Sequence, residues 1–533
     1  MTQMKLFSWK NLLAVITFFF GIIICQYTGN RGILPIDSFS HFDAGYRILN
    51  GEHPTKDYWV VSGFFVDYLQ SLIFYIFGIN WQTYLLNASL LNGLVSLLFY
   101  ILLNNLKLNF KISFFYAICF AILAYPSSGT PFVDHHSSFL SLIALLTLIY
   151  AIKTNKQYLW FLVPIFLFFA FLSKQVPATY ILFVTIIVTI LHILHQDKKK
   201  IIKIFLMLFT STLISIFSFL IFLKINEIDI KFFLTQYFYY PSSIGQERFS
   251  TIDYDFKNTF LHFKFIYISL FILIFFTLNN LKNKKVNFYK DLSFKILLIC
   301  IFSLISFVHH IIFTKNQIFI FFLIPFILSF ASIQIKQSNY DYKKIINIFL
   351  ILFCISLTFK YHLRFNVERK FHEMNDLQFS KALEAKLISK NFSGLNWITP
   401  NFLRQKIKKK EVIEEIDFLK DFNKILKLDK NNKAILTNYS FFSVINDEMI
   451  SGYSRWYPGD NSAFPTKDSK YYKDYKELIL SYIQKKKIKS VYILPDIDEN
   501  NLLDYVNRKC LQKKKLDNDV IKYEIVINCQ NLM

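Results

Sequence analysis

The 533-residue chain is 54% hydrophobic and 19% aromatic, and only 18% of its residues are charged. Soluble domains usually carry about 25% charge, so this composition excludes a conventional soluble enzyme, a disordered chain, a collagen and a coiled coil. The formal net charge of +23 raises the question of nucleic acid. The basic residues, however, come in short bursts between long apolar runs, which is typical of membrane topology. The composition therefore predicts a polytopic α-helical membrane protein with no nucleic-acid partner.

Long apolar runs recur from Leu12 to Phe359. A bilayer core needs roughly 20 apolar residues per helix, and we expect about eleven spans in residues 1–360. The first run, 12–27, has no small-residue cleavage site after it, so it is interpreted as an uncleaved span that begins on the cytoplasmic side. Basic bursts then fall in every second gap, as alternate cytoplasmic loops should show. The bursts include Lys107 and Lys111, Lys153 and Lys156, Lys198 to Lys203, Lys282 to Lys290, and Lys336 to Lys344.

An odd number of spans that starts inside ends outside, which predicts an extracytoplasmic C-terminal region, 361–533, on what we expect to be a bacterial inner membrane. Two outer loops, 30–80 and 226–264, are too long for simple connections and are predicted to be functional or separately folded. The first contains the apolar stretch 64–77, interpreted as an interfacial helix. If that stretch were a true span, every later side assignment would invert.

The C-terminal region is polar and Lys-rich, and its pattern predicts a small α/β domain. Segments 433–438, 488–494 and 521–528 are rich in Val, Ile and Tyr and are predicted strands, and 471–485 has helical spacing. Cys510 and Cys529 both lie in this region. An extracytoplasmic location permits a disulfide between them, but the sequence also allows two unpaired thiols.

Carboxylates follow the first span closely, at Asp37, Asp43 and Asp57. A carboxylate beside hydrocarbon is costly, and a general base needs an available carboxylate near the proton it removes. If the chain after Pro35 is helical, Asp37 and Asp43 lie on adjoining faces about a turn and a half apart. The alternative interpretation is that Asp37 is a helix N-cap and Asp43 a solvated helix residue.

Three short segments follow Asp37 in the first outer loop, namely Ala44-Gly45-Tyr46-Arg47, Gly51-Glu52-His53-Pro54 and Asp57-Tyr58-Trp59. Together with Asp37 they resemble the first periplasmic loop of the GT-C fold membrane glycosyltransferases, which include protein O-mannosyltransferases and the lipid A aminoarabinose transferase. The resemblance implies that Asp37 is the catalytic base or positions the acceptor. The family often has a second acid immediately afterwards. Here Ser38 follows, which leaves Asp43 as the second catalytic carboxylate.

A second acidic segment, Asp134-His135-His136, follows the outer gap that begins at Pro126. It resembles the second acidic loop of the family, which faces the donor phosphate, and so implicates Asp134 and His135. Carboxylate and imidazole also bind zinc or manganese, so a divalent metal stays open, although no metal ligand is assigned. The alternative is that Asp134 caps the next span and the histidines lie at the interface.

Three cations lie on the Lys-poor outer side, at Lys174, Arg248 and Lys315. By resemblance Lys174 and Lys315 contact the donor phosphate, and Arg248 has the planar guanidinium that suits phosphate. The alternative is that the lysines snorkel to the headgroups as interfacial anchors. In the C-terminal region, the segment 455–460 offers aromatic groups for carbohydrate contact, but core and turn roles are favoured there.

The resemblance implies an inverting glycosyltransferase that moves a sugar from a polyprenyl-phosphate donor to an unidentified glycan, lipid or protein acceptor. Asp37 would take the acceptor proton, and the cations would stabilise the departing lipid phosphate. A transporter or flippase of lipid-linked glycans is the main alternative, and it would place charges at mid-membrane, often between repeats. A third interpretation is a catalytically silent member whose C-terminal region binds a partner.

Overall fold

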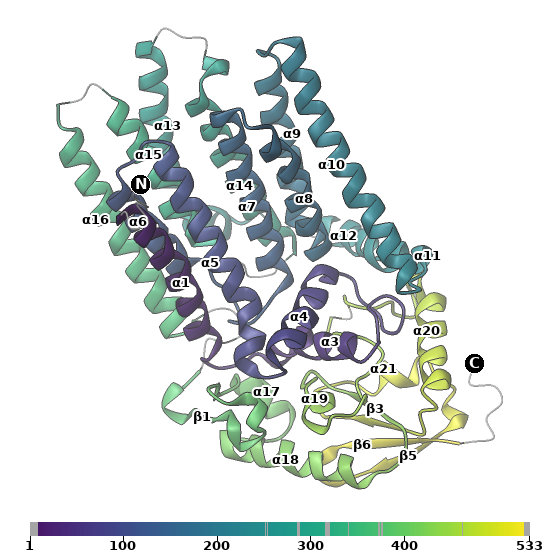
Figure 1. The fold of residues 1–533 in the computed structure, drawn as a ribbon. Helices are drawn as coiled ribbons and strands as arrows, with labels where there is room; N and C mark the ends of the chain where they lie inside the picture. Colours follow the sequence, from purple (N-terminus) through teal and green to yellow (C-terminus); the bar gives the residue numbers. More distant parts are fainter. Residues whose placement is uncertain are drawn as a thin grey trace, which may run out of the picture.

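The computed structural model describes residues 9–250, 252, 254–284, 288–314, 320–338, 341–370, 374, 377–460 and 462–526. A bundle of long helices stands on a smaller C-terminal part that contains a sheet (Figure 1). In the described ranges, nine helical segments are long and apolar enough to cross a membrane. They comprise α1 (Trp9–Gly29), α5 (Trp81–Asn105), α7 (Val133–Thr154), α9 (Gln175–Ile193), α10 (Lys198–Ile225), α13 (Lys264–Lys284), α14 (Leu292–Thr314), α15 (Leu323–Gln337) with its preceding turn, and α16 (Lys343–Tyr361).

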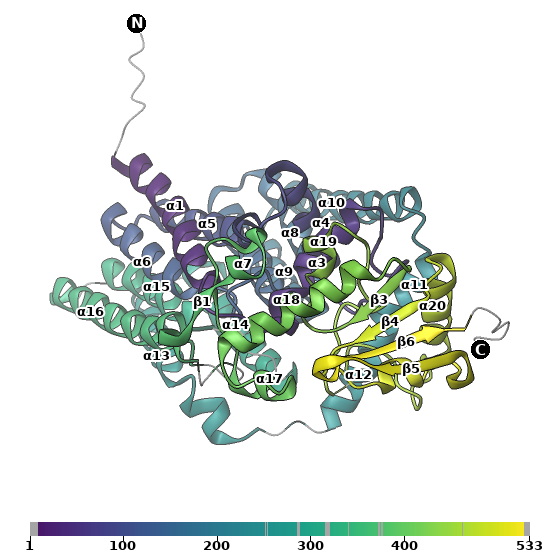
Figure 2. The ribbon, with the colours of Figure 1, turned by 90° about the horizontal axis from the view of Figure 1, so that it is seen from below.

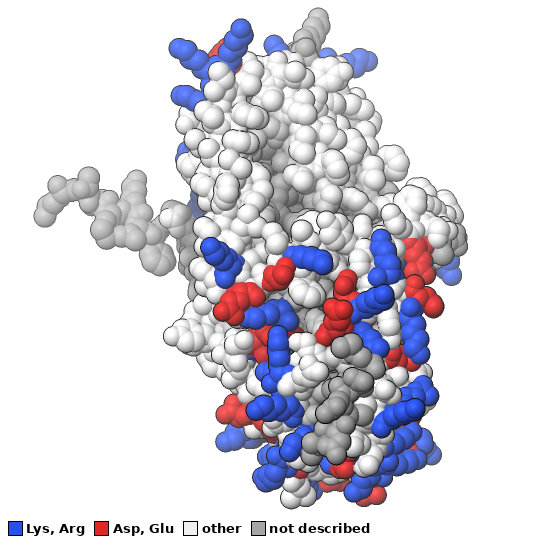
Figure 3. Space-filling model, turned by 90° about the vertical axis from the view of Figure 1, so that its right-hand side faces the viewer, with Lys and Arg blue, Asp and Glu red and all other residues white. Residues whose placement is uncertain are grey.

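Three further apolar helices are shorter, and they are α4 (Phe64–Phe77), α6 (Phe110–Leu123) and α8 (Gln157–Ser173). Counting α6 and α8 as spans would reproduce the number expected from the sequence, but how many helices cross, and in which direction, stays a prediction. The surface in Figure 3 is almost free of charged side chains over the helical part, with Lys and Arg at its far end and many charges over the C-terminal part. This distribution is typical of an integral membrane protein.

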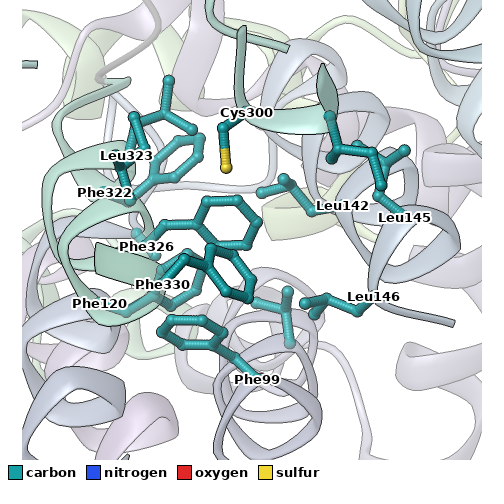
Figure 4. Packing of buried hydrophobic residues seen from close by; sticks show 14 of the residues in the cluster. Phe99, Phe120, Leu142, Leu145, Leu146, Cys300, Phe322, Leu323, Phe326 and Phe330 are labelled. Carbon is teal, nitrogen blue, oxygen red and sulfur yellow. The ribbon is translucent and has the colours of Figure 1, made fainter. Parts of the chain in front are cut away.

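Small and amide side chains allow the helices to approach closely. A Cβ atom on Gly21 of α1 would lie 2.9 Å from the Cα of Gly93 in α5, so only glycine fits at this crossing. Beside it, the Asn92 side chain donates hydrogen bonds to the carbonyl oxygens of Gly21 at 3.1 Å and Ala121 at 3.2 Å. One buried amide therefore ties α1, α5 and α6 together. Deeper in the bundle, phenylalanine and leucine side chains from α5, α6, α7 and α15 interdigitate (Figure 4).

Both long loops that were expected on the outer side are largely helical. Residues 30–80 contain α2 (Pro35–Ser38), α3 (Ser40–Leu49) and α4, and residues 226–264 contain α11 (Ile230–Leu234), a π-helical turn (Thr235–Tyr239), α12 (Tyr240–Ser250) and a second π-helical turn (Lys257–Leu261). The helix expected at 64–77 is confirmed in its bounds. Its face with Asp67 and Phe74 is buried, while Tyr75 and Phe77 are exposed. This amphipathic surface suits an interfacial position, which stays a prediction.

The C-terminal part contains a four-stranded sheet in the order β3-β4-β6-β5. The strands are β3 (Lys433–Leu436), β4 (Ser490–Ile493), β5 (Leu511–Lys515) and β6 (Ile521–Ile525). Strands β3 and β4 are parallel, with Ala434 opposite Val491, and the other pairs are antiparallel. Helices α18 (Val412–Leu428) and α20 (Tyr472–Lys485) lie beside the sheet (Figure 2). The three expected strands and the expected helix at 471–485 are confirmed within the described residues, whereas β5, an edge strand of exposed lysines, was not predicted.

The C-terminal part is joined to residues 30–80 by backbone hydrogen bonds. The Ile33 N–H donates to the Ile398 carbonyl at 3.0 Å, and the Trp59 N–H donates to the Tyr453 carbonyl at 2.9 Å. An aromatic core that includes Phe39 of the loop and Trp397 of the C-terminal part lies between them. Cys510 is buried in this part, and Cys529, with which the sequence permits but does not require a disulfide, lies outside the described residues.

Candidate functional site

A cavity of about 670 Å³ lies where the helix ends meet the C-terminal part. Its described wall includes α2, the start of α7, the turn between α8 and α9, α12, the end of α14 and residues 456, 458, 462 and 463 of the C-terminal part. Most of the lining is apolar or aromatic, and Phe238 and Phe249 of this wall are also exposed on the outside. The polar groups in the wall include Asp37, Ser62, Lys174, Gln175, Gln246 and Arg248.

Asp37 reaches the cavity from the short helix α2. Pro35 lies at the start of this helix, where its missing N–H costs nothing. The N-cap position is taken by Leu34, whose N–H donates to the Ser38 hydroxyl at 3.1 Å. Asp37 is therefore not the N-cap that one interpretation of the sequence expected. Its side chain is half-buried in the cavity wall.

Asp43 is not in this cavity. Helix α2 ends at Ser38 and α3 begins at Ser40, so the single helix that would place Asp37 and Asp43 on adjoining faces does not form. Asp43 is buried against the C-terminal part, where it accepts a 2.5 Å hydrogen bond from the Ser451 hydroxyl. It lines a separate pocket of about 10 Å³. Because burial outweighs the nearby Arg47, the pKa of Asp43 is raised to about 7.

Lys174, the C-cap residue of α8, lines the cavity, and its ammonium is paired with a buried carboxylate. The Lys174 Nζ lies 2.8 Å from each carboxylate oxygen of Asp134. The His310 Nε2 of α14 lies 2.5 Å from Asp134 Oδ1. Asp134 and His310 are fully buried, whereas the Lys174 side chain keeps 15% exposure. Asp134 therefore does not face the cavity but fixes the position of the cation that does.

The two histidines after Asp134 point elsewhere. The His135 ring packs on Phe139, with 4.2 Å between the ring centroids, and it does not line the cavity. The His136 Nε2 lies 2.8 Å from Asn87 Oδ1 of α5. Consecutive residues of a helix diverge by about 100°, so Asp134, His135 and His136 cannot converge on one ion. The histidine that contacts Asp134 is instead His310 of α14.

Arg248 of α12 also lines the cavity and is 28% exposed. Its Nη1 donates to the Thr314 carbonyl at 3.1 Å, and its Nη2 lies 3.8 Å from Asp460 Oδ2 in the C-terminal loop. Lys315, the third expected cation, lies outside the described residues, although its neighbour Thr314 is part of the wall. The structure thus brings Asp37, Lys174 and Arg248 together and leaves Asp43 and His135 out.

A second buried charged cluster stands behind the cavity, and the sequence interpretation missed it. Arg455 of the C-terminal loop donates to the carboxylate of Asp67 in α4 and to the carbonyl of Ser62. The His41 Nδ1 lies 2.6 Å from the other Asp67 oxygen. Burial lowers the pKa of His41, so the neutral ring donates this bond. The available signal was Asp67, a carboxylate inside an apolar helix, which needs a buried partner.

Comparison with protein-family models and with curated proteins finds no match for this chain. The chemistry of the cavity must therefore be argued from its own residues. In the part of the wall that the structure describes, the half-buried carboxylate of Asp37 and the cations of Lys174 and Arg248 share a mainly apolar space at the ends of the long helices. Such a site suits an amphiphilic anion held at its charged group, next to a nucleophile that loses a proton.

Proposed function

We propose that this chain is a GT-C-like membrane glycosyltransferase that moves a sugar from a polyprenyl-phosphate donor to an acceptor hydroxyl or amine at the extracytoplasmic face. The observation that carries the proposal is the convergence of Asp37, Lys174 and Arg248 on one cavity at the helix ends. An outer-face enzyme has no nucleotide sugars, so a lipid phosphate is the reasonable leaving group. Its charge needs cations near the membrane surface.

The proposed reaction is a single displacement with inversion. The acceptor oxygen or nitrogen attacks the anomeric carbon while the bond from that carbon to the phosphate oxygen breaks. Asp37 takes the acceptor proton, and the electron pair of the broken bond stays on the polyprenyl phosphate. Lys174 and Arg248 stabilise the negative charge that develops on this phosphate. No other group is required to balance the step.

Asp134 and His310 are assigned as positioning residues in this scheme. The paired carboxylate holds the Lys174 ammonium at a fixed place in the wall. Positioned charges stabilise a developing charge without reorganising during the reaction. Arg248 lies farther from its acidic neighbour Asp460, at 3.8 Å, and in the proposed scheme its guanidinium binds the phosphate.

The position of the cavity favours an enzyme over a transporter. Its lining residues fall at the start of α7, in the turn between α8 and α9, and at the end of α14. A transporter site is expected near the middle of the spans and between broken helices. The charged groups of this cavity lie instead at one end of the helices, where a water-soluble or membrane-surface acceptor can reach them.

In the test, cells that express the protein carry Asp37→Asn in place of the native chain. Membranes from these cells, which hold the native acceptor, are supplied with polyprenyl phosphate bearing labelled glucose, galactose or mannose. Loss of a general base reduces rates by about 10²–10⁴-fold, so we expect release of polyprenyl phosphate to fall by that factor, with normal protein abundance. Asp57→Asn, in the same loop but outside the cavity wall, is the matched control. Full activity of Asp37→Asn would overturn the assignment of the base.

A further inference from the structure

The C-terminal part supplies a portion of the cavity wall, through Trp456, Pro458, Ser462 and Ala463. We propose that the indole of Trp456 is the surface on which the sugar ring of the donor packs. This inference rests on the proposed transferase function and assigns a substrate-binding role to the C-terminal region. An indole offers a large, rigid apolar surface with a polar N–H, and such groups contribute strongly to binding at low entropic cost.

Two side chains that do not line the cavity, Arg455 and His41, contact the Trp456 indole and fix its orientation. The Arg455 guanidinium lies 3.9 Å from the ring centroid and covers one face. The His41 ring stands perpendicular to the indole, with 5.8 Å between the centroids. Arg455 is buried and does not line the cavity. The surface that Trp456 gives to the cavity is therefore the remaining face or edge.

The loop that bears Trp456 is fixed by the first outer loop. The Trp59 N–H bonds the Tyr453 carbonyl at 2.9 Å, and the Arg455 N–H bonds the Trp59 carbonyl at 3.3 Å. The bonds from Arg455 to Asp67 and Ser62 secure the same turn. A binding surface that is already ordered loses little entropy when a ligand binds. Trp456 is thus built into the site before substrate arrives.

The phosphate ligands place the sugar near this loop. Asp460 lies four residues after Trp456, and its carboxylate is 3.8 Å from the Arg248 guanidinium. Arg248 and Trp456 line the same cavity, so a phosphate bound by Arg248 brings its attached sugar into the space that the indole borders. Ser62, Ser462 and Gln246 line the same cavity and can bond sugar hydroxyls. The combination of one aromatic surface with hydroxyl and amide groups fits a carbohydrate.

The experiment measures binding to the full-length chain in detergent by microscale thermophoresis. The probes are polyprenyl phosphate without sugar and polyprenyl phosphate carrying glucose, galactose or mannose. We expect the wild-type chain to bind one sugar-bearing lipid most tightly. Trp456→Ala should weaken the binding of that lipid about tenfold, which corresponds to roughly 1.4 kcal/mol. Binding of the sugar-free lipid should be unchanged. Trp456→Phe should recover part of the preference.

Trp9→Ala is the matched control, because Trp9 is an exposed tryptophan at the start of α1 and does not line the cavity. It should bind every probe as the wild type does. If Trp456→Ala keeps the wild-type preference for the sugar-bearing lipid, or if the wild type shows no preference, the role of Trp456 is overturned while the transferase proposal can stand. If the wild type neither binds nor consumes any of these donors, the transferase proposal itself fails, and the inference fails with it.

Discussion

The buried carboxylates of Asp134 and Asp43 have different partners, and these partners determine whether the charged form of each is stabilised. Asp134 has Lys174 at 2.8 Å and His310 at 2.5 Å, so its negative charge is compensated. Asp43 accepts a 2.5 Å hydrogen bond from the Ser451 hydroxyl, and the nearest Arg47 nitrogen lies farther away, at 3.9 Å. A carboxylate in that position favours its protonated form. Two acids that are equally plausible in the sequence therefore take different roles in the structure.

The raised pKa of Asp43 predicts a pH-dependent stability. The pKa rises from 3.8 to about 7 on folding because the side chain is buried. The unfolded state then loses its proton first, so the stability that the protonated carboxyl contributes is complete below the unfolded pKa and is lost as pH rises through about 7. We expect the midpoint of thermal unfolding of the wild type to fall progressively as the pH rises from about 4 to about 7, the interval between the unfolded and folded pKa values, and to level off above it. Asp43→Asn should remove this part of the decline.

Asp57→Asn is the control for this measurement, because Asp57 lies in the same loop and bonds the His53 N–H at 2.8 Å rather than the C-terminal part. It should follow the wild-type pH dependence. An Asp43→Asn chain that loses as much stability as the wild type over the same range would show that Asp43 is already ionised in the folded protein.

At the scale of elements, a buried ion pair joins α4 to the C-terminal loop that bears Trp456. Arg455 and Asp67 form it, with both side chains at most 1% exposed. Removing one partner of a buried ion pair leaves an uncompensated charge and costs about 3–5 kcal/mol. Arg455→Met should therefore lower the free energy of unfolding by that amount and make the loop sensitive to limited proteolysis.

A double variant tests whether Arg455 and Asp67 stabilise each other. Asp67→Asn combined with Arg455→Met removes both charges, and replacing a whole buried pair is far less costly than breaking it. We expect the double variant to be more stable than either single variant, measured by denaturant unfolding in detergent. Equal or additive losses would show that the two side chains do not stabilise each other.

At the scale of the whole molecule, the arrangement of basic residues predicts on which side of the membrane each part lies. Cysteine accessibility tests this in intact cells. Lys427→Cys adds an exposed thiol to α18 of the C-terminal part, and Lys199→Cys adds one to the basic end of α10. A membrane-impermeant maleimide should label Lys427→Cys in intact cells and Lys199→Cys only after permeabilisation, relative to the unsubstituted chain. The reverse pattern would invert the predicted topology.

Much of the fold was predictable because the responsible signals are local. Apolar length gives the long helices, and the helix at 64–77 and the strands at 433–436 and 490–493 follow from spacing within a few residues. The break at Phe39 between α2 and α3 was not predictable, since it depends on the aromatic cluster that this side chain joins with Trp81, Trp397 and Phe441. A helix boundary set by tertiary packing leaves little trace in the local pattern.

By itself the sequence determined the hydrophobic class of the protein, most of its helices and strands, and a set of candidate charged residues that included Asp37, Lys174 and Arg248. Only the tertiary structure decided which of these charges share a cavity, because their partners are far apart along the chain. Asp134 and His310 are 176 residues apart, and Asp67 and Arg455 are 388 residues apart. A buried charge needs a partner, and the tertiary structure determines which residue that partner is. The pairing of Arg455 with Asp67 holds the turn that carries Trp456 in the cavity wall.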